Sequence, residues 1–157
     1  MTEKARVDRD ITVNRRAFFE YHIEDRAEAG MVLVGSEVKS LRDGHVNLKD
    51  SYVRVIDDEL WLIGMHISHY NPASQFSHAP ERQRKLLLNR REIDKLATKI
   101  QEKGLTLIPL RLYWKQGRAK AEIGVGRGKK AHDKRDSIKE QTERREMARA
   151  MSVKQRR

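Results

Sequence analysis

Three of the six histidines, His66, His69 and His78, lie close together in the sequence and are the first candidates for chemistry. A zinc site needs three or four converging ligands held by a supporting shell of hydrogen bonds. The spacing of these histidines matches no familiar metal pattern, and the chain has no cysteine to supply a thiolate. We therefore expect neither a metal site nor a cofactor.

A phosphate cradle is the second candidate, because three alternating glycines between positions 124 and 128 precede Lys129 and Lys130. Small residues let backbone amides approach an anion closely. A P-loop is nevertheless excluded, since Ile123 stands where the first glycine belongs and Ala131 lacks the magnesium-binding hydroxyl. We interpret the segment as a flexible basic hinge that contacts phosphates.

A catalytic centre is not indicated, because no nucleophile is paired with a base and the carboxylates are interspersed with basic residues. Glu28 falls in an expected exposed turn, where nothing would shift its pKa for acid or base catalysis. It could instead accept hydrogen bonds from base edges. We expect a protein that is not an enzyme. The weaker alternative, an RNA-cleaving enzyme, predicts activity that is lost when His66 or His69 is substituted.

The basic C-terminal segment, residues 126–157, indicates the partner. It holds 12 Lys or Arg against 5 Asp or Glu and no aromatic residue, within a chain whose net charge is +11. Such a segment cannot build a core of its own, so its charge is expected to face a polyanion that orders it. RNA is the expected polyanion, and a purely solubilising extension is the alternative.

The chain length of 157 residues suits one domain with extensions. Residues 1–13 are polar and predict a mobile N-terminal arm. They contain no signal peptide or membrane span, and the absence of cysteine suits a reducing cytosol, so we expect a cytoplasmic protein. Attachment to a membrane through residues 126–157 is disfavoured, because they lack the aromatic and leucine face of such helices.

Three pairs of β-prone runs predict three hairpins. Residues 18–23 and 31–34 flank a turn at 25–30 in which Gly30 would take a positive φ. Residues 51–56 pair with 60–67 around an acidic turn, and residues 105–115 pair with 120–125.

Two helices complete the expected domain. Ser36 is the expected N-cap of a short helix over residues 37–42, and a longer helix over 90–103 runs from Asn89 to Gly104. Residues 68–84, rich in breakers, predict an exposed loop. About six strands and two helices indicate a mainly β protein, an OB-like antiparallel barrel with a helix over one opening.

The tail has conditional structure of its own. Residues 137–151 are rich in helix formers but carry few apolar residues, too few to offset the entropy of ordering. We predict a tail that is disordered when free and helical on its partner.

Several motifs then add up to a family resemblance. They are Asn14-Arg15-Arg16-Ala17, Glu28-Ala29-Gly30, Gly35 to Arg42, Asp50-Ser51-Tyr52, Arg84 to Asn89, Tyr113-Trp114-Lys115 and Gly128 to Arg135. Their order and spacing resemble those of the bacterial SsrA-binding protein family, also called small protein B, from about Asn14 to the tail.

The resemblance implies an OB-like barrel over 14–125 that binds the tRNA-like domain of transfer-messenger RNA. It implies delivery of that RNA to stalled ribosomes for trans-translation, while the tail over 126–157 probes the empty mRNA channel and the decoding centre of the small subunit. Further implied partners are elongation factor Tu and alanyl-tRNA synthetase, both reached through the RNA. A monomer is implied, with no role for a membrane.

The resemblance also implies the site residues. The positions that match RNA contacts, first the principal and then the supporting ones, are Glu28, Leu87, Lys120, Asn14, Arg15, Arg16, Arg84 and Lys85. The positions that match the hinge and the ribosome-interacting tail are Gly128, Lys129, Lys130, His132, Asp133, Lys134, Arg135, Ile138 and Met151.

Without the resemblance, two of these positions also allow an interpretation with no role in RNA binding. Periodicity favours burial of Leu87 within three consecutive leucines, and Lys120 on a strand would ordinarily be a solvated charge. The alternative function is a general single-stranded or ribosomal RNA-binding OB protein, which would show little preference for one folded RNA.

Overall fold

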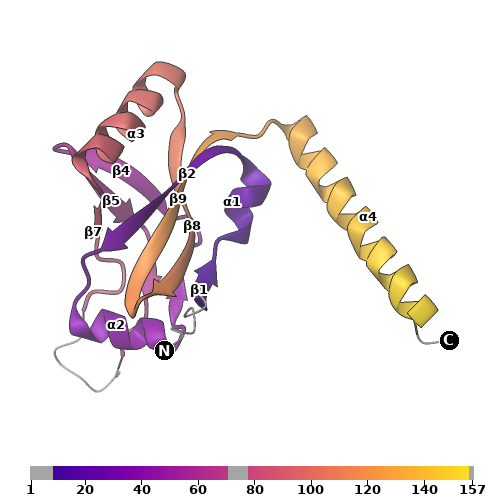
Figure 1. Cartoon of the computed structure of the whole chain (residues 1–157), viewed down its shortest axis with the longest axis horizontal. Helices are drawn as coiled ribbons and strands as arrows, with labels where there is room; N and C mark the ends of the chain where they lie inside the picture. Colours follow the sequence, from indigo (N-terminus) through magenta and orange to yellow (C-terminus); the bar gives the residue numbers. More distant parts are fainter. Residues whose placement is uncertain (1–8, 71–77, 156–157) are drawn as a thin grey trace, which may run out of the picture.

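Six antiparallel strands close into a ring in a computed structural model that describes residues 9–70 and 78–155. The ring runs β8-β4-β5-β7-β2-β9 and back to β8. Its strands are β2 (Tyr21–Met31), β4 (Tyr52–Ile56), β5 (Glu59–Ile63), β7 (Arg84–Leu87), β8 (Thr106–Lys115) and β9 (Arg118–Gly128). The predicted OB-like barrel is thereby confirmed (Figure 1).

Short elements lie around this ring. A further strand, β1 (Arg9–Val13), pairs with β8, while β3 (Val46–Asn47) and β6 (His66–Ile67) form a separate two-stranded sheet. The helices are α1 (Arg15–Glu20), α2 (Gly35–Arg42), α3 (Arg90–Lys103) and α4 (Ala131–Gln155). Figure 1 places α2 and α3 at opposite ends of the barrel.

The predicted helix over 90–103 is confirmed with both of its end signals. Asn89 is the N-cap, and its backbone amide donates to the Glu92 side chain of the first turn at 3.3 Å. Gly104 ends the helix at φ +62°, a left-handed conformation that glycine adopts without strain. Ile93 and Leu96 face the barrel opening and are buried.

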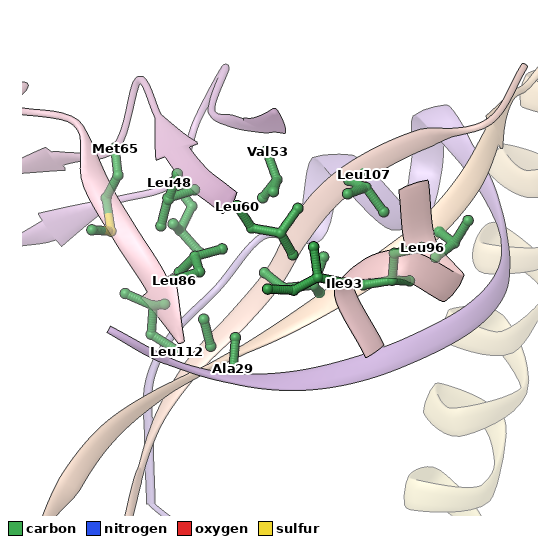
Figure 2. Packing of buried hydrophobic residues seen from close by; sticks show 14 of the residues in the cluster. Ala29, Leu48, Val53, Leu60, Met65, Leu86, Ile93, Leu96, Leu107 and Leu112 are labelled. Atoms are coloured by element: carbon green, nitrogen blue, oxygen red, sulfur yellow. The ribbon is translucent and has the colours of Figure 1, made fainter. Parts of the chain in front are cut away.

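The core fills the barrel with inward-facing aliphatic side chains (Figure 2). Leu60, Leu112 and Ile123 have no exposed surface, and Leu86 is 1% exposed. Alternation along each strand explains this pattern, since successive side chains point to opposite faces. Each fully buried leucine or isoleucine contributes about 1.5–3 kcal/mol of transfer free energy.

Two predicted hairpins are confirmed, and tight turns close them, but the strand predicted over 60–67 ends as β5 at Ile63, and His66–Ile67 pair with β3 instead. Asp57 and Asp58 connect β4 to β5 with φ values of +49° and +61°. Gln116 and Gly117 connect β8 to β9 with φ values of +52° and +75°. Paired positive φ angles give the turn the twist that two-residue hairpins require.

The first predicted hairpin is wrong. Residues 25–30 form no turn; they lie in the middle of β2, which pairs with β9 from Tyr21 to Gly30. Residues 15–20 form α1, because the Asn14 side chain accepts from the Ala17 amide and caps it. Gly30 has no positive φ and sits in the ladder opposite Lys120.

The predicted N-terminal arm needs a correction as well. Residues 9–13 form β1 and pair with β8 through Arg9, Asp10, Thr12 and Val13, so they belong to the sheet. Residues 1–8 lie outside the described part of the chain. Residues 71–77 of the predicted loop also lie outside it, and residue 84 already begins β7.

The tail differs from the predicted disordered segment, because α4 is a continuous helix of 25 residues. Figure 1 shows it standing apart from the barrel over most of its length. The barrel also extends further than predicted, since β9 pairs with β2 up to Gly128. Across residues 9–70 and 78–155, no helix is long and apolar enough to cross a membrane.

Candidate nucleic-acid interface

Four residues on neighbouring strands form one row across the outer face of the barrel. Leu87 of β7 pairs in register with Gly30 of β2, and Gly30 pairs with Lys120 of β9. Lys120 in turn pairs with Tyr113 of β8. The strand ladder therefore brings Leu87 and Lys120, 33 positions apart in sequence, to opposite sides of one glycine. We call the outer side of β7, β2, β9 and β8 the ladder face.

Leu87 lies on the surface of this face. Within β7, Arg84 and Leu86 point inward with 0% and 1% exposure, whereas Leu87 is 50% exposed. Burial of Leu87, which periodicity alone favoured, is therefore wrong, because the β7 alternation puts only its neighbour in the core. An exposed leucine beside a lysine can pack against an unstacked base.

A hollow of about 310 Å³ lies beside Leu87 and Lys120. It is lined by Gly30, Leu33, Leu87, Trp114 and Lys120, among others. A Cβ on Gly30 would make ordinary van der Waals contacts, 3.4 Å from the Leu87 Cβ and 3.7 Å from the Lys120 amine, so Gly30 lies directly between these two side chains. Its lining combines apolar side chains with the Lys120 cation, a combination that suits a base and its phosphate.

Glu28 lies next to this row on β2, two residues before Gly30, and its side chain is 39% exposed. Its Oε2 accepts a hydrogen bond from the buried Tyr113 hydroxyl. Lys115 donates to Oε2 at 3.1 Å and to Oε1 at 3.4 Å. The Tyr113 hydrogen bond, followed by Lys115, lowers the pKa of Glu28 below its ordinary value, although partial burial opposes this.

Further charges on the ladder face are arranged in pairs. Glu122 of β9 accepts from Arg26 at 2.9 Å and from Arg111 at 2.8 Å. The Arg111 guanidinium also pairs with Asp10 at 2.6 Å and lies 4.3 Å from the centre of the Tyr113 ring. These contacts fix the β8 and β9 side chains in place.

The Asn14, Arg15 and Arg16 cluster lies on α1, on a different part of the barrel. Asn14 is buried and donates to the Pro109 carbonyl at 2.9 Å while capping α1, so its role in the structure is to position that helix. Arg16 pairs with Glu20 at 2.8 Å and with Asp50 at 3.6 Å. Arg15 is exposed.

The predicted RNA contact by Arg84 is wrong, because its side chain is entirely buried. Its guanidinium pairs with Glu37 of α2 at 2.5 Å and donates to the Met65 carbonyl at 2.6 Å and the Pro80 carbonyl at 3.0 Å. Lys85, the next residue, points outward and pairs with Glu59 at 2.8 Å.

Glu37 is the buried counter-ion of two arginines. Arg82 also donates to it, as does the Val34 backbone amide at 3.0 Å. Burial raises the pKa of Glu37, but the Val34 amide, Arg82 and Arg84 together lower it below the ordinary value. The network fastens α2 to the start of β7 and so supports the strand that carries Leu87.

Three contacts hold the start of α4 against α1 and β2. The Lys129 backbone amide donates to the Glu20 carbonyl at 2.7 Å, and the Lys129 amine donates to the Phe18 carbonyl at 3.2 Å and to Ser137 at 2.7 Å. Asp133 lies 3.2 Å from His22 of β2, whose hydrogen bond lowers the pKa of Asp133. Lys129 and Asp133 therefore hold the tail's first turns against α1 and β2.

The remaining predicted tail residues present their side chains to solvent. Ile138 is 52% exposed and Met151 66% exposed, and His132 lies 3.3 Å from Asp136 within the helix. Lys130 and Arg135 are exposed, Lys134 is partly covered, and Gly128 ends β9 with no atom within 4 Å of the position that a Cβ would take. A helix exposed on nearly all sides with basic residues throughout suits a polyanionic surrounding.

The histidine cluster has a structural explanation. His78 is buried, and its two ring nitrogens contact the Ser36 hydroxyl at 2.9 Å and the Ile67 carbonyl at 2.8 Å. His66 is exposed on β6. Among the residues that the structure describes, no three metal-binding side chains come together.

Tyr113, Lys115 and Arg111 belong to the ladder face but were not among the predicted site residues. The triplet Tyr113-Trp114-Lys115 stood out only as part of the family resemblance. The alternation of polar residues along this strand indicated that they share one face. Their partners on β2 and β9 depend on strand pairing, which the sequence did not reveal.

Comparison with known proteins identifies the family. The family described as SmpB protein matches residues 11–153 of this chain. This chain belongs to the SmpB family. The SsrA-binding protein of Anaeromyxobacter dehalogenans (strain 2CP-C) is 54% identical over 144 residues, which cover 92% of this chain and 88% of that protein.

Other SmpB relatives extend the match over the full length. The SsrA-binding protein of Syntrophomonas wolfei is 49% identical over 156 residues, 99% of each chain. A solved chain described as "tmRNA-SmpB: a journey to the center of the bacterial ribosome" is 43% identical, with a TM-score of 0.66 over 81% of this chain and 93% of that one. The SmpB fold and the sequence family therefore agree.

Proposed function

We propose that this chain binds the tRNA-like domain of transfer-messenger RNA through the ladder face and delivers it to stalled ribosomes for trans-translation. The observation that carries the proposal is the row in which Leu87, Gly30 and Lys120 meet, with Glu28 beside it. There the apolar Leu87 can pack against a base and the Lys120 cation can pair with a phosphate. The Glu28 carboxylate can accept a hydrogen bond from a base or a sugar hydroxyl.

The tail has a separate task in this proposal. It enters the empty mRNA channel and the decoding centre, where His132 stacks on a base and Lys134 and Arg135 contact phosphates. The exposure of α4 along its length supports this task, because the basic side chains are already directed outward. Elongation factor Tu and alanyl-tRNA synthetase are reached through the RNA.

The chain acts as a binding protein in the cytoplasm and catalyses no reaction of its own. Relatives named SsrA-binding protein, and a solved chain described together with tmRNA and the bacterial ribosome, support these partners. The alternative is a general RNA-binding barrel, which would share the salt dependence but not the selectivity.

A competition titration tests the proposal. The intact chain is expected to prefer the tRNA-like domain of transfer-messenger RNA to bulk tRNA at every salt concentration tested. Leu87→Ala should weaken binding about tenfold, because base packing is worth about 1–3 kcal/mol, while the fold should be little affected since Leu87 is half exposed.

Val32→Ala is the matched control, an exposed apolar side chain 44% accessible and outside the proposed contacts. It should bind as the unaltered chain does. Equal affinity of the unaltered chain for both RNAs would contradict the proposed function and support the general RNA-binding alternative.

A further inference from the structure

The carboxylate of Glu28 is held on the ladder face by a residue that no part of the proposed function yet uses. Tyr113 is 3% exposed, and its hydroxyl donates to Oε2 of Glu28. Among the described residues, Glu28 is the hydrogen-bond partner of this hydroxyl. A buried phenol without a hydrogen-bond partner is unfavourable, so this hydrogen bond holds both side chains in place.

The Tyr113 ring is itself immobilised. Arg111 lies 4.3 Å from the ring centre and is held in turn by Asp10 and Glu122. Burial, and then the hydrogen bond to Glu28, raises the pKa of Tyr113. The phenol therefore stays protonated and acts as a fixed donor toward Glu28.

The two carboxylate oxygens of Glu28 differ in the hydrogen bonds that they accept. Oε2 accepts from Tyr113 and, at 3.1 Å, from Lys115, whereas the Lys115 contact with Oε1 is longer, at 3.4 Å. Each carboxylate oxygen can accept about two hydrogen bonds. Oε1 thus retains capacity for a donor from outside, on a side chain that is 39% exposed.

We infer that Tyr113 is a positioning residue that anchors one oxygen of Glu28 and presents the other, ionised, to a donor group of the bound RNA. The inference rests on the proposed function. It assigns the RNA group by chemistry: an amino or imino group of a base, or a ribose hydroxyl, but not a phosphate, which the carboxylate would repel.

The inference makes RNA affinity depend on pH through Glu28. Protonation would remove the acceptor charge, so binding should weaken as the pH falls through the pKa of this carboxyl. The charged and titratable groups on the strands around Glu28 are Tyr113, Lys115 and Arg111 of β8, Lys120 and Glu122 of β9, Asp10 of β1 and Arg26 of β2.

Tyr113→Phe in the full chain is the test, because it removes the hydroxyl and keeps the buried ring. The Glu28 carboxyl titration, followed by carbon-13 NMR in the free protein, should move up toward the ordinary value of a glutamate. Affinity for the tRNA-like domain should fall about tenfold at neutral pH, and the further loss on acidification should begin at a higher pH.

A double-mutant cycle separates positioning from a structural effect. In the Glu28→Gln background, Tyr113→Phe should cost little further affinity, because the residue that it positions has already lost its charge. Tyr52→Phe, an exposed tyrosine on β4, is the control and should change neither the titration nor the affinity.

Two results would overturn the inference: an unmoved Glu28 titration in Tyr113→Phe, or the same loss of affinity with and without Glu28→Gln. Failure of the proposed function looks different. In that case the unaltered chain shows no preference for the tRNA-like domain over bulk tRNA, while the Glu28 titration still moves; the RNA role of Tyr113 is then rejected together with the proposed function.

Discussion

Arg84 and Lys85 are neighbours in the chain but belong to different environments. Arg84 is fully buried against Glu37, whereas Lys85 lies outward beside Glu59. Two adjacent basic residues both resembled RNA contacts in sequence, since nothing local distinguishes a buried arginine from a solvated one. The buried position needs a counter-ion, and Glu37, 47 positions earlier, supplies it.

Glu37→Gln should destabilise the fold by about 3–5 kcal/mol, because it leaves Arg84 buried without its counter-ion. Urea unfolding measures this, with Glu59→Gln as the control; that exposed pair with Lys85 should cost less than about 1 kcal/mol. An equal effect of the two substitutions would contradict the assignment.

The buried pair of Glu37 and Arg84 also makes the stability of the fold depend on pH in the acid range. The pKa of Glu37 is lowered in the folded protein, so the unfolded chain binds its proton more readily. Its contribution to stability is complete above the ordinary glutamate pKa of about 4.3 and is lost as the pH falls through the lower folded value. The unfolding midpoint of Glu37→Gln should therefore depend less on pH in that range.

At the scale of elements, the sequence predicted a helix or hairpin correctly where residues at its ends mark its boundaries. The helix over 90–103 has Asn89 and Gly104, and the hairpins at 57–58 and 116–117 have tight turns. β2 was missed because nothing local marks it. Its charged residues between 24 and 28 look like a turn until β9 supplies hydrogen-bond partners.

The tail is more ordered in the structure than the sequence predicted. Composition predicted disorder without a partner, yet α4 is helical from Ala131 to Gln155. Its residues are mostly good helix formers, and contacts of Lys129 and Asp133 hold its first turn. The prediction underestimated this nucleation, which depends on Phe18, Glu20 and His22 of the barrel.

The close approach of β9 to β8 gives a prediction for Gly124. A Cβ there would lie 2.9 Å from a methyl carbon of Leu110, which is fully buried. Gly124→Ala should therefore destabilise the barrel by about 1–3 kcal/mol through overpacking.

Gly35→Ala is the matched control, since no atom lies within 4 Å of its Cβ position and the residue begins α2. Thermal unfolding of the two variants compares them directly. A Gly124→Ala protein as stable as Gly35→Ala would show that Leu110 can move aside, and that the strands are less tightly packed than the structure indicates.

At the scale of the whole molecule, the ladder face and the tail are separate surfaces of one chain. Figure 1 shows α4 leaving the barrel beyond the end of β9. The sequence resemblance suggested both surfaces and most of the residues that we propose for them. It could not assign Tyr113 or exclude Arg84, because both depend on which way a strand residue faces.

Reconstituted trans-translation on stalled ribosomes, with RNA capture measured in the same samples, tests this division most directly. Lys120→Ala should reduce capture of transfer-messenger RNA and tagging together, and excess RNA should restore both. Lys134→Ala with Arg135→Ala should leave capture intact and reduce tagging, with no rescue by excess RNA. Loss of capture in the tail variant, or normal capture by Lys120→Ala, would contradict the account.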